Sequence, residues 1–109
     1  MAQQASDTPV LDLLAGMTAL SLEATTLDTQ EVVLARIAAL VAVDAPPISY
    51  ALNLRVAGAS DITADQIRGV FAAIAPIVGT ARIAAATGNI IKALALEELA
   101  AEAGEDVEA

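Results

Sequence analysis

Few side chains in this sequence could do chemistry. Its 109 residues include no Cys and no His. Their lack excludes thiol catalysis, disulfides and Cys-ligated metal centres, and it removes the side chain that titrates near neutral pH. Acid–base catalysis would have to use a carboxylate, Lys92 or Tyr50. Because the sequence also lacks the glycine-rich phosphate motifs, the nucleophile elbow and the zinc-binding HExxH motif, we expect no catalytic residue, no metal and no cofactor.

Five of the fourteen carboxylates lie at predicted helix ends. Glu31 follows Asp28 by three residues, which is the spacing of a capping box. Asp44 stands beside a Pro-Pro pair and is interpreted as a helix cap. Asp61 and Asp65 flank a predicted helix start, where the helix dipole favours negative charge. These positions indicate structural roles for the acids.

Arg36 is the only charge in the apolar run from Val32 to Val43. A helix that is apolar on all sides is buried, and an unpaired buried charge is very costly. We therefore expect Arg36 to form an ion pair within the chain or between subunits. The alternative is an anion-binding site that faces a pocket.

A small polar pair lies on the next predicted helix. Ser49 and Asn53 are four residues apart, so both point to the same side of the helix. A Ser hydroxyl without a base to take its proton is not an activated nucleophile. We expect the pair to satisfy local hydrogen bonds.

Apolar residues recur at helical spacing in five segments, which predicts an all-α, compact bundle of about five helices. The helices are expected to begin near residues 9, 29, 46, 64 and 81, with a loop at 58–62 and the last helix ending near Ala103. Two starts carry capping boxes, at Asp28 and at Thr63 with Gln66, and Gly79 suits a left-handed helix end. We divide the chain into an N-terminal arm (1–8), one helical domain (9–103) and an acidic tail (104–109).

Charge narrows the possible partners. Five Lys and Arg against fourteen Asp and Glu give a net charge of −9. Nucleic acids and anionic membranes attract basic surfaces, so we expect neither as a partner. The first residues lack the features of a signal peptide, and the longest apolar runs are shorter than the roughly 20 residues of a membrane span. A cytoplasmic location is expected.

Hydropathy favours self-association. The chain is 57% hydrophobic, with a mean hydropathy of +0.66. A domain of this size buries only about two thirds of the surface of its unfolded chain, so a monomer would leave much apolar surface in water. Large exposed apolar patches usually mark interfaces. We therefore expect an obligate homo-oligomer.

The order of features resembles the carboxymuconolactone decarboxylase family, which includes the alkylhydroperoxidase-D-like proteins. Four segments carry the resemblance: Leu27–Glu31, Pro46–Gly58, Ile62–Ile67 and Ile77–Thr80. The resemblance covers about residues 10 to 100. It implies an all-helical subunit that assembles into a homo-trimer or homo-hexamer.

The family's catalytic positions are all substituted here. Its Cys-x-x-Cys-x-x-x-His element falls on Pro46, Ser49 and Asn53, and its Glu falls on Val33 or Leu34. Without thiols, His or Glu, neither the redox nor the decarboxylase mechanism of the family can operate.

Three functions remain open. The first is a catalytically inactive member of the family that acts as a homo-oligomeric scaffold or interaction protein. The second is a protein that binds an aromatic or lactone acid in the ancestral pocket, or a divergent lyase, whose pocket we assign to Arg36, Pro46, Ser49, Tyr50 and Asn53. The third is an accessory subunit that docks through its acidic tail.

Overall fold

The computed structural model describes residues 6–108, with the side chains of residues 97 and 100–108 excepted. Within these residues every regular element is a helix, which confirms the predicted all-α class. The five helices are α1 (Pro9–Ala24), α2 (Thr29–Ala42), α3 (Pro47–Ala59), α4 (Ala64–Val78) and α5 (Thr80–Glu108). Residues 1–5 of the predicted arm and Ala109 of the predicted tail lie outside the described residues.

Both predicted capping boxes are present. At the start of α2, the Glu31 N–H donates to Asp28 Oδ1 and the Asp28 N–H donates to Glu31 Oε1, each at 2.9 Å. At the start of α4, the Thr63 N–H donates to Gln66 Oε1 at 2.8 Å, and the Gln66 N–H donates to Thr63 Oγ1 at 3.1 Å. Each box satisfies two backbone N–H groups that the helix itself leaves without partners.

Three helix ends differ from the sequence prediction. Asp44 does not cap α3, whose N-cap is Pro46; instead it has φ 54°, and its N–H donates to the Val41 carbonyl at 3.1 Å. Asp can adopt this left-handed conformation, so Asp44 ends α2. Helix α3 continues through Gly58 to Ala59, so the loop begins later than predicted. Helix α5 continues past Ala103 to Glu108, and the predicted acidic tail is helical to that residue.

The main core lies where α2, α3 and α5 meet. Its buried residues are mostly small: Val41, Ala45, Tyr50, Ala51, Ala86 and Ala93. Because alanine has a short side chain, α3 and α5 pack closely along the alanines, and Asn89 of α5 donates to the Ala45 carbonyl at 3.2 Å. A second cluster of Val33, Ile37 and Ala57 joins α2 and α3 to α4. The buried alanines therefore serve helix packing.

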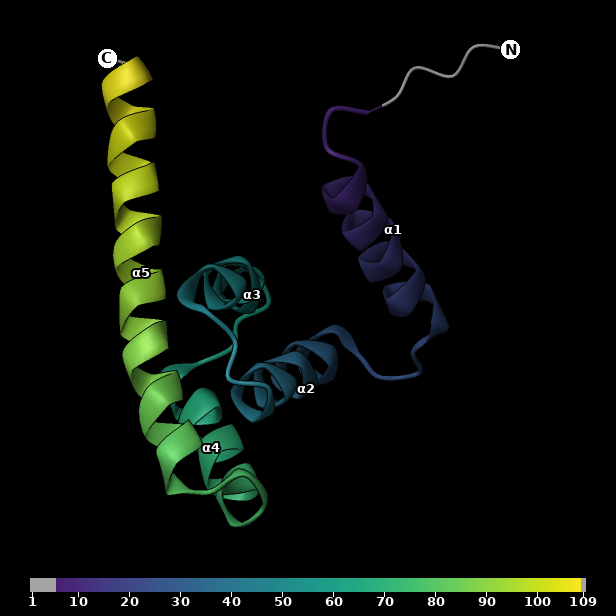
Figure 1. Ribbon diagram of the computed structural model, residues 1–109, viewed down its shortest axis with the longest axis vertical. Helices are drawn as coiled ribbons and strands as arrows, with labels where there is room; N and C mark the ends of the chain where they lie inside the picture. Colours follow the sequence, from purple (N-terminus) through teal and green to yellow (C-terminus); the bar gives the residue numbers. More distant parts are fainter. Residues whose placement is uncertain (1–5, 109) are drawn as a thin grey trace.

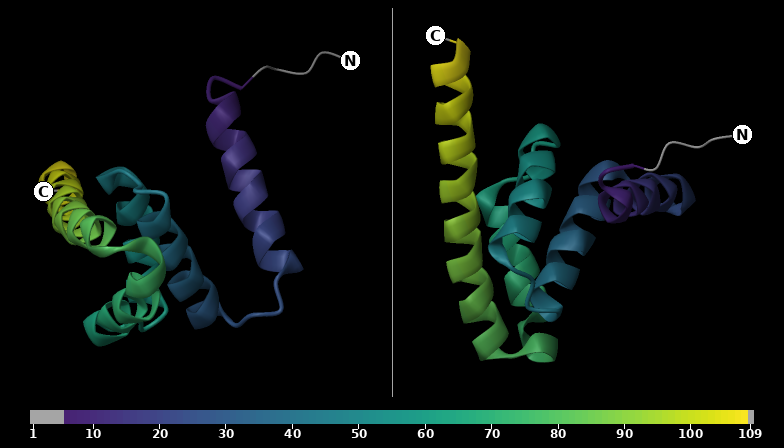
Figure 2. Two further views of the ribbon diagram at one scale, coloured as in Figure 1. Left: turned by 60° about the horizontal axis from the view of Figure 1, so that its bottom comes forward. Right: turned by 45° about the horizontal axis from the view of Figure 1, so that its top comes forward.

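Helix α1 stands apart from this core. Figures 1 and 2 show it on one side of α2 and α3, with α5 on the other side. Every residue of α1 is exposed. Its seven large apolar side chains are between 50% and 66% exposed: Val10, Leu11, Leu13, Leu14, Met17, Leu20 and Leu22. An isolated helix of this length is only marginally stable in water, so α1 needs a packing partner.

A helix that crosses a lipid bilayer must be both long and apolar. Within the part of the chain that the structure describes, no helix is both long enough and apolar enough to cross a membrane.

Candidate functional site

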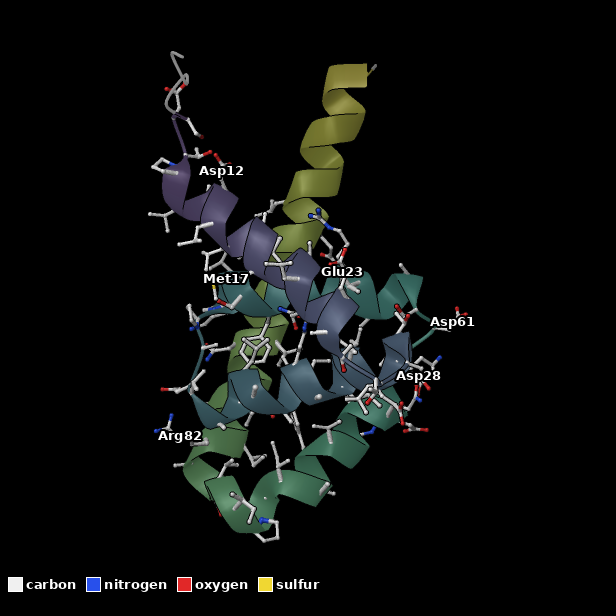
Figure 3. All side chains as sticks on the ribbon, turned by 90° about the vertical axis from the view of Figure 1, so that its right-hand side faces the viewer. Asp12, Met17, Glu23, Asp28, Asp61 and Arg82 are labelled. Carbon is white, nitrogen blue, oxygen red and sulfur yellow. The ribbon has the colours of Figure 1, made fainter. Side chains whose placement is uncertain are left out.

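The candidate site is a cleft where α1 crosses over α2 and α3. In Figure 3, α1 passes in front of these two helices, with Met17 near the middle of its length. The cleft has a volume of about 390 Å³. Its lining comes from all three helices: Leu14, Met17, Thr18 and Ser21 from α1, Arg36, Ala39 and Leu40 from α2, and Asn53 from α3.

Arg36 lies at the junction of α1 and α2. It is half-buried, and its Nη2 donates to Ser21 Oγ at 3.1 Å. The sequence predicted a buried charge with an acidic partner; the structure shows a partly solvated guanidinium bound to a hydroxyl. The difference arises because α1 does not pack closely on α2, so water reaches this side of an otherwise apolar helix.

Asn53 of α3 lines the same cleft as Arg36. It is half-buried, and its Nδ2 donates to the Ser49 carbonyl at 2.9 Å. The amide of Asn53 thus bonds the backbone one turn earlier, as the spacing of Ser49 and Asn53 predicted. This bond uses one amide proton and leaves the amide oxygen available as an acceptor.

Tyr50 belongs to the core instead of the cleft. It is one residue along from Ser49 and therefore turned by about 100° around α3, toward α2 and α5. Its side chain is 0% exposed, and its hydroxyl has no hydrogen-bond partner among the described residues. Burial, and next the charge of Asp44, raise the pKa of Tyr50 above its ordinary 10.0.

The buried hydroxyl of Tyr50 gives a stability prediction. A buried polar group without a partner costs about 1–3 kcal/mol, so Tyr50→Phe should raise the free energy of unfolding by about 1 kcal/mol.

Because the pKa of Tyr50 is raised, ionisation above pH 10 favours the unfolded chain. The native chain should therefore lose stability as the pH rises past 10.0, and Tyr50→Phe should lose less. Thermal melts by circular dichroism between pH 7 and 11 measure both effects, and a destabilised variant at pH 7 would contradict the first.

The structure thus brings together two of the five residues assigned to the site. Arg36 and Asn53 line the cleft; Pro46 and Ser49 are absent from its described lining, and Tyr50 is in the core. The α1 residues Leu14, Met17, Thr18 and Ser21 were missed. Their helical spacing was visible in the sequence, but no sequence signal showed which helix α1 would cross.

The cleft combines a cation with polar and apolar walls. The Arg36 guanidinium can bind a carboxylate, and the Asn53 amide and the hydroxyls of Thr18 and Ser21 can hydrogen-bond beside it. The residues described as its lining include no carboxylate, Lys or Tyr that could act as an acid or base. Among the residues that the structure describes, no cluster of three acidic side chains could hold a metal ion. The residues that line the cleft could together bind a carboxylate.

Comparisons with known proteins do not identify the chain. No protein-family model, curated protein or solved structure matches it. The resemblance to the carboxymuconolactone decarboxylase family remains a prediction, based on the segments and substituted positions described above.

Proposed function

We propose that the chain is a non-catalytic, homo-oligomeric helical scaffold, a divergent protein of carboxymuconolactone decarboxylase type. The extent of its surface carries the proposal. The chain exposes 7605 Å², whereas a compact monomer of 11.0 kDa exposes about 5,600 Å². The excess of about 2,000 Å² on one chain is more than the roughly 800 Å² that each partner buries in a protein–protein interface of standard size.

Large apolar side chains are exposed on two projecting helices. The Cα radius of gyration is 16.1 Å, compared with about 13 Å for a compact domain of this length. Helix α1 projects from the body, and α5 extends beyond the other helices (Figure 1). Leu94, Leu96 and Leu99 on α5 are exposed, as are the leucines of α1. A second copy of the chain could cover both surfaces.

Native mass spectrometry over a range of protein concentrations tests this proposal. We expect a trimer or hexamer at micromolar concentration, with little free monomer. Multi-angle light scattering on a size-exclusion column should give the same mass in solution. A monomer at all concentrations in both measurements would overturn the proposal.

A second candidate function is the binding of a small aromatic or lactone carboxylate in the α1–α2–α3 cleft. The observation in its favour is that Arg36 and Asn53, from different helices, line the same cleft. Leu14, Met17 and Leu40 give it an apolar wall for a ring. Self-association and binding are compatible, because the ligand would sit beside α1.

Ligand binding can be tested by the melting temperature. A carboxylate present at about 100 times its dissociation constant should stabilise the native state by about 2.7 kcal/mol and raise the melting temperature by several degrees. Arg36→Gln should remove most of that rise, because it removes the charge that binds the carboxylate. Arg82→Gln, at an exposed arginine outside the cleft lining, should keep it. An unchanged melting temperature across a panel of such acids would contradict this candidate.

A further inference from the structure

An apolar groove lies on the side of the molecule away from α1. It is formed by α3, α4 and α5 and has a volume of about 500 Å³. Its apolar lining includes Leu54, Ile67, Phe71, Ile90, Ile91 and Leu94. At its rim, Ile91 is 64% exposed and Leu94 is 50% exposed. A groove of this kind in water favours an apolar occupant.

The chain's own α1 lies on the opposite side of α2 and α3 from α5, as both views of Figure 2 show. Residues 25–28 join α1 to α2. Because four residues span at most about 14 Å, this connection holds the end of α1 near the start of α2. One copy therefore has an unpartnered apolar helix on one side and an unfilled apolar groove on the other.

The helix and the groove are both apolar. Helix α1 has 16 residues, so it is about 24 Å long and presents large apolar side chains along its length. Its charged residues are Asp12 and Glu23, which lie toward its two ends (Figure 3). Among the described residues that line the groove, the one that carries a charge is Arg68, which forms an exposed ion pair with Asp65 of the same helix. The property that the helix and the groove share is therefore their exposed apolar surface.

We propose that α1 of one copy docks in the α3–α4–α5 groove of a second copy. The proposal rests on the proposed self-association and adds which surfaces meet. Because the helix and the groove are different surfaces, the contact is heterologous, and repeating it closes a ring when the rotation permits. Each copy then contributes one helix and one groove, which leaves neither surface in water.

Disulfide trapping tests this contact, since the natural chain has no Cys. Leu13→Cys places a thiol on α1, and Ile91→Cys places one at the groove rim. The two variants are purified separately, mixed, allowed to exchange subunits and oxidised. We expect a disulfide-linked heterodimer, at a yield several times that obtained with Ile77→Cys in place of Ile91→Cys. Ile77 is 86% exposed and does not line the groove.

Other outcomes would overturn the docking contact in recognisable ways. A link between two Leu13→Cys chains in preference to the mixed pair would show that α1 pairs with α1. A double variant that cross-links within one chain, at the monomer mass, would show that α1 fills its own groove. An oligomer by native mass spectrometry without the mixed link would overturn the contact alone, whereas a monomer would overturn the self-association as well.

Discussion

Replacing Leu13 and Leu20 of α1 with Glu should convert the oligomer into monomers. These side chains lie seven residues apart on one side of α1, are 63% and 66% exposed in the single chain, and do not line the cleft. If both are anchors in an interface, each should contribute at least about 2 kcal/mol. Together they should lower the association constant by about 1,000-fold. Native mass spectrometry and light scattering measure the change.

The matched control for this variant is Ile48→Glu with Ile77→Glu. Both isoleucines are exposed and lie outside α1 and the apolar groove, and the control adds the same two negative charges. It should remain oligomeric. The α1 variant should also lose helical signal in far-UV circular dichroism, because α1 without a packing partner is marginally stable. Retention of the full oligomer by the α1 variant would show that α1 is not in the interface.

Ile37→Ala should strongly destabilise the native chain. Ile37 is 0% exposed and packs in the cluster that joins α2, α3 and α4. Removing a buried Ile side chain to Ala costs about 2–5 kcal/mol through lost burial and the cavity left behind. The free energy of unfolding of a small domain is only about 5–15 kcal/mol. The melting temperature should therefore fall by about 10 °C or more.

The control for Ile37 is the same substitution at a surface isoleucine. Ile77 is 86% exposed, so Ile77→Ala should change stability by less than about 0.5 kcal/mol. Urea unfolding followed by circular dichroism compares the two variants. Equal effects would contradict the assignment of Ile37 to the core.

The sequence predicted the features that depend on near neighbours in the chain. A capping box needs two side chains three residues apart, so Asp28 with Glu31 and Thr63 with Gln66 could be identified without any knowledge of the fold. The positive φ of Gly79 could be predicted for the same reason. Local hydrogen bonds and backbone sterics decide these features, and they act within a few residues.

Features that depend on how helices cross were not predicted. Arg36 was expected to be buried because its neighbours in α2 are apolar, but its exposure depends on how closely α1 packs. The placement of Tyr50 was not predicted either, because Ser49, Tyr50 and Asn53 lie within about 100° of one another around α3, and the packing of α2 and α5 decides which of them is buried. The contribution of Ser21 to the cleft could not be predicted, since it depends on a contact between residues fifteen positions apart.

The buried position of Tyr50 also makes the chain well suited to optical study. It is the single tyrosine, and the sequence has no tryptophan, so intrinsic fluorescence reports on the packing of α2, α3 and α5. Helix α1 contributes to far-UV circular dichroism but has no such fluorophore. Coincident transitions by the two probes would indicate that α1 and the core unfold as one cooperative unit, and separate transitions would resolve them.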